Sequence, residues 1–537
     1  MASLCYNACI MSKVVLLAIN AKYVHSSLAV WVLAGGVTRY AKLPHDVHIV
    51  ESTIHQHNDD IVDLIAASAP DVVAISTYIW NASKLPGLLK LLRESLPDTV
   101  LILGGPEASH NAAFWLKIGA DFVLHGEGEY NLPMLLDALA EGKPAPAESS
   151  LPAEPIDPYN ADYLNALQGR LAYLETSRGC PFQCAFCLSG GSGVRFFPIE
   201  SAKTQIYKLS QSGARTIKFV DRTFNCDANR AYELFEYIIG LDTTCCFHFE
   251  VGADLFDERT LSLLSTAPPG RIQIEAGLQS FFEPALNASS RQTDLHKAEQ
   301  NIRAILQSRN IHVHVDLIAG LPYETLPDFQ NGFDRAYALG AHTLQLGFLK
   351  LLHGSQLRAQ AENLEIHYSA EPPYEIQHSP WLSAEDLQTL KHAENALQHT
   401  YNKGRFLSVL EYVLSVSGIR PFSLFRALGE AAPNHATSLS DYAVGIYDFC
   451  VNLPGIDANA LKDRLICDWL SMVKGKNAPH FLKNDGRNRV TETAEQMLGR
   501  KIPRVEAAML STGKGVFADS VHRDPVTGLY TLHFVEL

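Results

Sequence analysis

The sequence is poor in cysteine, carries fewer basic than acidic residues, and has no long apolar run. Ten cysteines among 537 residues are too sparse for a disulfide-stabilised scaffold. No segment approaches the roughly 18 uninterrupted apolar residues of a membrane-spanning helix. The 44 basic and 58 acidic residues give a formal charge of −14, which argues against an open nucleic-acid-binding face. We therefore expect a cytoplasmic protein that is not a membrane protein.

The length allows about three domains. Met11 is an alternative start to Met1, because the first clear strand begins only at Lys13. Five prolines between Gly142 and Pro158 indicate an exposed boundary. We expect a first domain at 11–143, a linker at 144–165, a second domain at 166–354 and a third at 355–537.

The first domain alternates short apolar runs with helix-like stretches. Continuous Val, Ile and Leu character indicates parallel strands buried on both faces. The alternation predicts a doubly wound, Rossmann-like α/β sheet, whose ligands bind beyond the carboxyl ends of the strands. The expected strands are Val14–Ile19, Val47–Val50, Val72–Ser76, Val100–Leu103 and Phe122–Leu124, with helices such as Ser26–Tyr40 and Lys84–Leu96 between them.

The second domain repeats the pattern in six strand–helix units, which predicts an open, partial (β/α)6 barrel. Barrel enzymes place their chemistry at the carboxyl-terminal ends of the strands. The expected strands are Ala172–Thr176, Thr216–Val220, Phe247–Val251, Ile272–Ala276, Val313–Ile318 and Thr343–Phe348. The third domain is mostly helical and ends in a β-hairpin that turns at Gly528.

Three cysteines follow the first strand of the predicted barrel within eight residues. Cys180, Cys184 and Cys187 can hold three corners of a 4Fe–4S cluster. No fourth protein ligand lies nearby, so one iron stays open to a small molecule such as the amino and carboxylate groups of methionine. Zinc usually requires a second ligand pair, which is missing here. The remaining cysteines are scattered, which argues against an auxiliary cluster; Cys226 reads as a free buried cysteine or a catalytic one.

The segment Arg178–Cys187 resembles the cluster-binding motif of the radical S-adenosylmethionine (SAM) superfamily. The resemblance implies that the three cysteines bind the cluster and that Phe186 is the aromatic residue preceding the last ligand. Further family motifs follow in order through the barrel, although the glycines usual near Asp221 are absent. By resemblance, SAM contacts are expected at Asp221, Asn225, Glu250, Glu275, Gln279, Ser280, Asp316 and Gly320.

The first domain resembles the cobalamin-binding domain that precedes some radical SAM barrels. The resemblance implies that Ser76, Gly104 and Gly105 line the cobalamin nucleotide tail. The usual D-x-H-x-x-G loop is absent after the first strand, and Asp46-Val47-His48 lies within the second. The alternative that this domain binds no ligand and serves only to pack against its neighbours therefore remains open. The candidate neighbours of the corrin ring, each also readable as a plain loop residue, are His25, Tyr78 and Trp80.

The resemblance implies an enzyme that cleaves SAM reductively and methylates an unactivated carbon, with an electron donor such as flavodoxin or ferredoxin. Alternatives are a cobalamin-dependent cyclase, ring-rearranging or oxidative enzyme, and a non-catalytic cobalamin-binding module. A transfer-RNA-modifying enzyme is disfavoured, because a second cysteine triad is absent. The substrate, a small molecule or a peptide, stays open. The candidate lining residues Tyr368, Tyr374 and Glu375 also read as plain loop.

Overall fold

The computed structural model describes residues 12–148, 155–191, 193–431, 438–474, 478–482 and 486–536. The two alternative starts, Cys5, Cys9 and part of the predicted linker (149–154) lie outside the described residues. The chain forms two compact units. The first runs to Phe249 and also includes Lys350–Ile376, and the second comprises Glu250–Leu349 and the chain from Gln377 onward. The predicted domain boundaries remain predictions.

The first unit begins with a five-stranded parallel sheet in the order β2-β1-β3-β4-β5. This order reverses direction between β1 and β3, so the loops after these strands flank the crevice where such sheets bind ligands. The strands are β1 (Ser12–Asn20), β2 (His45–Thr53), β3 (Val72–Ser76), β4 (Val100–Gly104) and β5 (Phe122–Val123).

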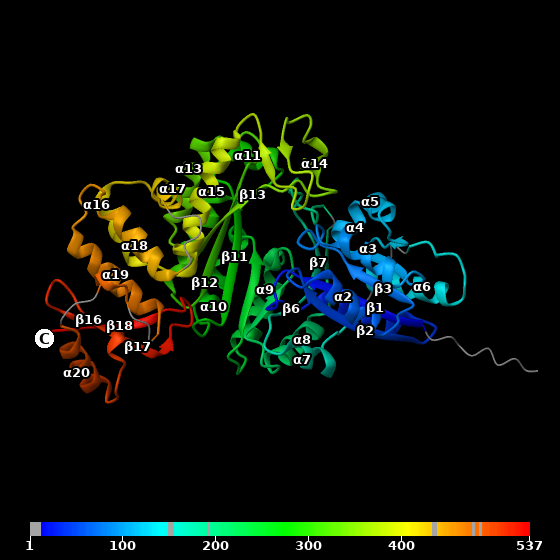
Figure 1. Ribbon diagram of the computed structural model, residues 1–537, viewed down its shortest axis with the longest axis horizontal. Coiled ribbons are helices and arrows are strands. Elements are labelled where there is room, and N and C mark those ends of the chain that lie inside the picture. The colour runs from blue at the N-terminus through cyan, green and yellow to red at the C-terminus, as the bar shows by residue number, and fades with distance from the viewer. Residues whose placement is uncertain are drawn as a thin grey trace, which may run out of the picture. The chain divides into compact units, whose positions relative to one another are not determined.

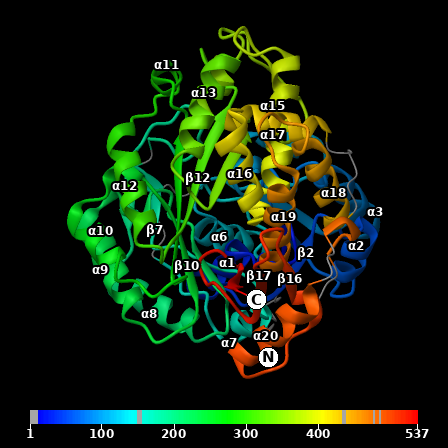
Figure 2. The same cartoon turned by 90° about the vertical axis from the view of Figure 1, so that its left-hand side faces the viewer.

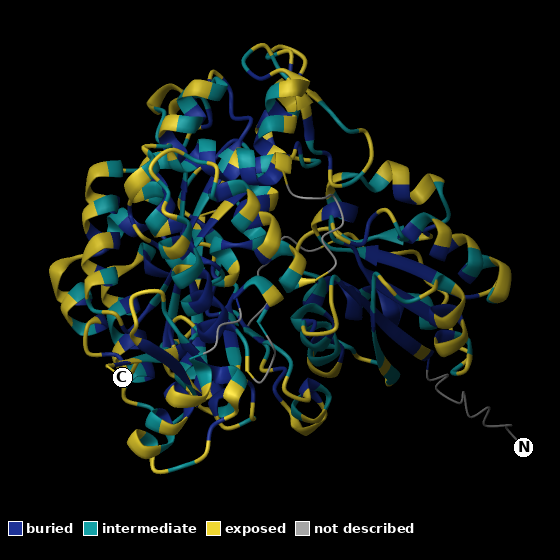
Figure 3. Cartoon of the chain, turned by 60° about the vertical axis from the view of Figure 1, so that its left-hand side comes forward, coloured by how far each residue is buried: buried dark blue, intermediate teal, exposed yellow. Residues whose placement is uncertain are grey.

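Helices cover both faces of this sheet, because alternate strand residues enter two separate cores. One core joins the sheet to α1 and α6, and the other joins it to α2, α3 and α5. Figure 3 shows the resulting buried strands between partly exposed helices. The predicted doubly wound sheet is confirmed. The helices are α1 (Leu28–Tyr40), α2 (Asn58–Ala66), α3 (Leu85–Ser95), α4 (Pro106–His110), α5 (Ala112–Lys117) and α6 (Gly128–Ala140). Figure 1 labels all of them except α1.

The second sheet has the strand order β13-β12-β11-β10-β9-β6. The strand pairs β13–β12, β12–β11, β10–β9 and β9–β6 are parallel. The predicted partial barrel of six strands is therefore confirmed. The elements in the first unit are α7 (Ala161–Leu167), β6 (Ala172–Leu174), β7 (Ser177–Cys180), β8 (Gly193–Phe196), α8 (Ile199–Ser210), β9 (Thr216–Phe219), α9 (Ala228–Ile239) and most of β10 (Cys246–Val251).

In the second unit, helices pack on one face of the strands, as Figure 2 shows for α10, α12 and α13. Along β11 and β12 every second residue is buried, and the residues between them stay partly exposed on the opposite, inner face. The elements are α10 (Glu258–Leu264), β11 (Ile272–Gln279), α11 (Glu283–Ala288), α12 (Leu295–Gln307), β12 (His312–Ala319), α13 (Leu326–Tyr337) and β13 (Thr343–Phe348).

The chain after β13 is mostly helical, as predicted. The predicted terminal hairpin is present as β17 and β18, and the short strand β16 extends it to a three-stranded antiparallel sheet. The elements are α14 (Gln356–Gln360), β14 (His367–Tyr368), β15 (Ile376–His378), α15 (Ala384–His399), α16 (Leu407–Ser417), α17 (Pro421–Ala431), α18 (Leu439–Cys450), α19 (Ala458–Met472), α20 (Arg487–Leu498), β16 (Ala507–Met509), β17 (Gly515–Arg523) and β18 (Tyr530–Val535).

Candidate active site

The three clustered cysteines lie on the loop that leaves β7, here called the cluster loop (Cys180–Cys187). None of the three forms a disulfide; Cys180 and Cys184 are buried and Cys187 is half-buried. The Cys187 amide donates to the Cys184 carbonyl oxygen at 3.0 Å, which closes a tight turn. The Ser189 amide donates to Cys187 Sγ at 3.4 Å. Amide hydrogen bonds to sulfur suit thiolate ligands of an iron–sulfur cluster, so this loop fits the predicted group.

Asp221, which follows β9, braces the strand that leads into the cluster loop. Its buried carboxylate accepts hydrogen bonds from the Thr176 amide (2.9 Å), Thr176 Oγ1 (2.7 Å) and Ser177 Oγ (2.6 Å). Burial raises the pKa of Asp221 to about 6 despite these donors. Asp221 thus holds the start of β7 in position through Thr176 and Ser177. Its contact with SAM stays a prediction.

Arg178, two residues before the first cysteine, is surrounded by carboxylates. Its Nη1 lies 2.7 Å from Glu129 Oε1 and 3.2 Å from Glu127 Oε2, and its Nη2 lies 2.7 Å from Glu175 Oε2. Arg195 on β8 reaches Glu127 at 2.7 Å. Burial opposes the charge on Arg178, but the carboxylates outweigh it and raise the pKa of Arg178 further. These five residues, the Arg178 cluster, tie the β7–β8 hairpin to the start of α6.

Aromatic side chains lie in the loops that follow β1 and β3. Tyr78 and Trp80 stack with ring centroids 4.3 Å apart and planes 8° apart. Trp80 is 44% exposed, although its Nε1 donates to the Ile19 carbonyl oxygen, and Tyr23 after β1 is 69% exposed. Exposed flat rings at the ligand-binding edge of such a sheet fit a large planar ligand such as a corrin. By contrast, His25 Nδ1 lies 2.6 Å from Tyr173 Oη, within the protein.

The predicted tail-binding residues lie at the ends of β3 and β4. Ser76 is buried, and its Oγ donates to the Leu17 carbonyl oxygen at 3.4 Å. Gly105 has φ +99°, and a Cβ there would lie 2.7 Å from the Thr77 carbonyl oxygen. Glycine is therefore required at 105 for the two loops to pack. At Gly104 an added Cβ would lie 3.9 Å from Leu124, which is ordinary van der Waals contact, so the packing does not require glycine there.

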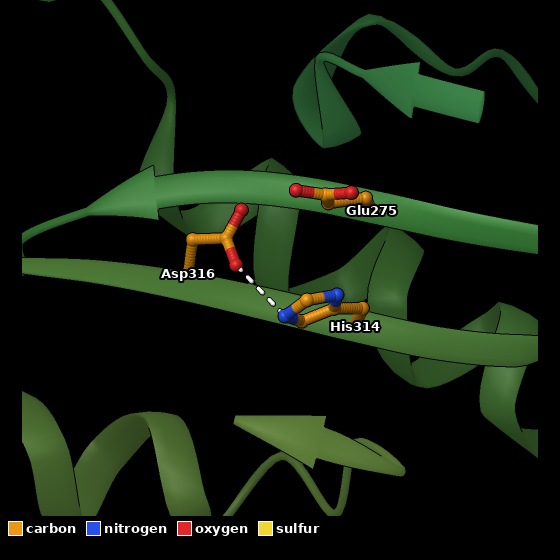
Figure 4. A group of neighbouring side chains, drawn as sticks. All are labelled: Glu275, His314 and Asp316. Carbon is orange, nitrogen blue, oxygen red and sulfur yellow. Dashed lines mark ion pairs between the residues drawn. The ribbon is translucent and has the colours of Figure 1, made fainter. Parts of the chain in front are cut away.

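In the second unit, Glu275, His314 and Asp316 gather on the inner face of β11 and β12. Glu275 pairs in register with His314, so the two side chains emerge opposite each other. His314 Nε2 lies 3.0 Å from Asp316 Oδ1, and one ligand atom from each of the three residues lies within 4.8 Å of the others (Figure 4). Two predicted SAM contacts therefore share a polar site with His314, which sequence analysis did not select.

The end of β11 has an unusual backbone conformation at Gln279, within the Glu275–Ser280 motif. Gln279 adopts φ +70°, and its amide approaches Gly277 so closely that a Cβ at 277 would collide with it. Ser280 Oγ donates to Glu324 Oε1 at 2.5 Å and accepts from the Phe282 amide. Glu324 is 1% exposed, and burial raises its pKa to about 8. Ser280 thus joins the ends of β11 and β12 through an acid that carries its proton at neutral pH.

The structure places the predicted residues in two sets, one in each unit. In the first unit are the three cysteines, half-buried Phe186, Asp221, buried Asn225, Ser76, Gly104 and Gly105. In the second are Glu250 near the end of β10, Glu275, Gln279, Ser280, Asp316, and Gly320, which follows β12 with φ +98°. The roles of these residues toward SAM and cobalamin stay predictions.

Three families match successive parts of the chain. Residues 14–136 match the B12 binding domain, residues 174–336 match the radical SAM superfamily, and residues 362–523 match a protein family of unknown function, DUF4080. None of the helices in the described part of the chain has the length and apolar character needed to span a bilayer.

Curated relatives cover part of the chain. The 2-(S-pantetheinyl)-carbapenam-3-carboxylate methyltransferase of Streptantibioticus cattleyicolor is 27% identical over 51% of this chain and 46% of its own length. The hopanoid C-3 methylase of Methylococcus capsulatus is 29% identical over 36% and 42%. The anaerobic magnesium-protoporphyrin IX monomethyl ester cyclase of Rubrivivax gelatinosus is 26% identical over 58% and 60%. The chain spans less than half the length of the first two relatives.

Solved structures show the same fold. The radical SAM methyltransferase TsrM from Kitasatospora setae, solved with cobalamin and a 4Fe–4S cluster, aligns with TM-score 0.55 and 18% identity over 67% of this chain and 76% of its own. The cobalamin-dependent radical SAM enzyme OxsB aligns with TM-score 0.57 and 13% identity over 85% and 78%. The predicted family and fold class are confirmed: the chain carries a B12 binding domain followed by a radical SAM domain.

Proposed function

We propose that this protein is a cobalamin-dependent radical SAM enzyme that cleaves SAM reductively and methylates an unactivated carbon of its substrate. The observation that carries the proposal is the cluster loop, which keeps three thiols on a strand-end turn within the same compact unit as the B12 binding domain. The relatives named methyltransferase and methylase support the methyl transfer. We place the enzyme in the cytoplasm, with a flavodoxin or ferredoxin as electron donor.

The residues of this chain would divide the work as follows. Cys180, Cys184 and Cys187 would hold the cluster, which when bound supplies the electron for SAM cleavage, as cobalamin supplies the methyl group. Trp80 would offer cobalamin a ring face, and Gly104 would line the cobalamin nucleotide tail. The carboxylates of Glu275 and Asp316 would accept hydrogen bonds from SAM hydroxyl or amino groups. The other proposed contacts are Phe186, Asp221, Asn225, Glu250, Gln279, Ser280 and Gly320 for SAM, and Ser76 and Gly105 for cobalamin.

The test begins with protein purified without oxygen, reconstituted with iron and sulfide, and supplied with hydroxocobalamin, SAM and dithionite. We expect 5′-deoxyadenosine and S-adenosylhomocysteine, the latter only when cobalamin is bound. Cys184→Ala should abolish both products. Cys226→Ala, which removes a cysteine outside the predicted ligands, should keep them. A well-formed cluster that yields neither product would overturn the proposal.

A second function has one specific observation in its favour. The magnesium-protoporphyrin ester cyclase relative covers a larger share of this chain than the methyltransferase relatives do. A cyclase, ring-rearranging or oxidative enzyme would form 5′-deoxyadenosine in the same assay without S-adenosylhomocysteine. The ratio of the two products therefore separates the two functions.

A further inference from the structure

The segment Lys350–Ile376, here called the strap, leaves the barrel after β13 and joins the first compact unit. Its two ends meet: Lys350 and Glu375 form an antiparallel bridge, and the Leu351 amide donates to the Tyr374 carbonyl oxygen at 2.9 Å. The strap is thus a closed loop with a fixed base. Its residues contact two other parts of the unit, one through side chains and one through the backbone.

The first contact is with α4, which directly follows Gly104 and Gly105. Tyr374 Oη donates to Glu107 Oε1 at 2.5 Å, and both residues are at least 96% buried. Burial raises the pKa of Glu107, and the Tyr374 hydroxyl and the Arg358 charge act in the opposite direction. A buried carboxyl group needs such partners, so Glu107 fixes the strap on α4.

Arg358 holds Tyr374 in place within the strap. Its guanidinium lies 4.8 Å from the Tyr374 ring centroid and 5.0 Å from the Tyr368 ring centroid. Arg358 Nη1 also donates to the Leu351 carbonyl oxygen, at 2.5 Å. Arg358 therefore contacts both ends of the strap, at Leu351 and at Tyr374.

Two more residues fit the strap to the end of α4. Gly354 has φ +88°, and a Cβ there would collide with the His110 ring. His353 Nε2 lies 3.3 Å from Asn111 Nδ2 and packs edge-on against Tyr374. Burial, with the nearby Arg358 charge, lowers the pKa of His353 to about 4, so this ring is neutral and accepts from Asn111.

The second contact is with the cluster loop. The Leu357 amide donates to the Ala185 carbonyl oxygen at 2.8 Å, and both side chains are buried. Ala185 directly follows Cys184. One short stretch of the strap, Gly354–Arg358, therefore contacts both α4 and the cluster loop.

We propose that the strap sets the separation between the Gly104–Gly105 loop and the cluster loop, and that Tyr374 is its principal positioning residue. The functional meaning rests on the proposed function, in which these loops hold cobalamin and the cluster. Tyr374 acts through Glu107 and α4. A fixed separation would keep cobalamin and the cluster at a constant distance from each other, so that the two loops need not rearrange during the reaction.

The test compares Tyr374→Phe with Tyr368→Phe in the full chain with its cluster reconstituted. Both variants keep a ring beside Arg358, but only the first removes the hydroxyl that reaches Glu107. Hydrogen exchange would be measured in peptides covering 104–110 and 180–187, before any cobalamin is added. Hydroxocobalamin affinity would then be measured by absorbance titration. We expect Tyr374→Phe to raise hydrogen exchange in both peptides and to weaken hydroxocobalamin binding roughly tenfold. The reason is that the buried Glu107 carboxylate loses its hydrogen-bond donor.

Tyr368→Phe should leave hydrogen exchange and hydroxocobalamin affinity as in the wild type. Glu107→Gln, whose amide oxygen still accepts from Tyr374, should give values close to those of the wild type. Faster exchange at 104–110 alone would reduce the strap to a local brace of α4 and overturn the coupling. Unchanged exchange in both peptides would also overturn it. If wild-type protein bound no hydroxocobalamin while Tyr374→Phe still raised both exchange rates, the proposed function would fail and the coupling would stand.

Discussion

Near the candidate site, three carboxylates of the first unit share one arginine, whereas one buried carboxyl group of the second unit is neutralised by a proton. Glu127, Glu129 and Glu175 surround Arg178 at the β7–β8 hairpin. Glu324 instead accepts from the Ser280 hydroxyl, and its pKa rises to about 8. A nearby cation favours the charged form of a carboxylate, whereas burial without one favours the protonated form. The Arg178 cluster and Glu324 should therefore respond differently to mutation and to pH.

The largest effect is expected from Arg178→Met, which leaves three partly buried carboxylates close together without their shared cation. Removing one partner of a buried ion pair costs about 3–5 kcal/mol. Urea denaturation of the purified chain should show a loss of this size in the free energy of unfolding. Arg178→Lys should recover part of it, because one ammonium group cannot reach every carboxylate as a planar guanidinium does. A loss no larger than that of a surface pair would remove the contrast between the units.

Glu324→Gln tests the proton-neutralised acid. The folded-state pKa of Glu324, about 8, lies above its ordinary value of 4.5, so the folded state binds the proton more tightly. This stabilisation is complete below about pH 4.5 and is lost as the pH rises through 8. The contribution of Glu324 to wild-type stability should fall by up to roughly 1.4 kcal/mol per pH unit, or about 3 kcal/mol between about pH 5 and pH 7. In urea denaturation at the two pH values, Glu324→Gln should lose less unfolding free energy between about pH 5 and pH 7 than the wild type. An equal loss in the two proteins would show that Glu324 is ionised.

Glu51→Gln extends the comparison to a second cation-paired acid. Glu51 accepts from Arg170 (2.9 Å), Asn20 Nδ2 (2.9 Å) and Trp31 Nε1 (3.1 Å). Glutamine keeps one acceptor but turns an amide donor toward these groups, which should cost about 2 kcal/mol. Thermal or urea unfolding would measure the loss. Glu148→Gln, which changes an exposed partner of His125, provides the matched control and should cost far less.

Lys143→Met should have the smallest effect. Lys143 Nζ lies 2.7 Å from Glu141 Oε2, but the two side chains are 63% and 41% exposed. Solvent-exposed pairs contribute roughly 0–1 kcal/mol, so we expect a change below about 0.5 kcal/mol. The same urea experiment measures it. A loss comparable with that of Arg178→Met would mean that burial does not distinguish the two ion pairs.

Much of the fold follows from local sequence. β3 and β13 begin and end where predicted, because each is a short, mainly apolar run bounded by polar or turn residues. The β7–β8 hairpin was not predicted, since its strands are short, carry arginine and glycine, and show no apolar alternation. β16 is a three-residue strand that only its pairing with β17 defines. Pairing of this kind is a tertiary property.

The candidate site shows the same limit. The three cysteines could be predicted from spacing alone, because cluster ligands on one loop are close in sequence. The Arg178 cluster could not, since Glu127 and Glu129 are distant in the chain and reach Arg178 only after folding. The proton on Glu324 depends on its burial beside Ser280, and burial of one side chain cannot be read from its neighbours in sequence. Tyr374 was predicted either to line the substrate site or to lie in a plain loop, and folding gives it Glu107 as a partner.

The strap also imposes an order on biosynthesis. Gly104, Gly105 and the cluster loop leave the ribosome well before Lys350–Ile376, and the N-terminal parts of a chain begin to fold first. The nascent chain thus presents both loops, joined at first through the Arg178 cluster at α6, before the strap can contact them. The contact between Tyr374 and Glu107 forms only after the strap has been synthesised. A chain truncated before Lys350 would retain every cluster cysteine, the whole B12 binding domain and the Arg178 cluster, yet it would lack the contact between Tyr374 and Glu107.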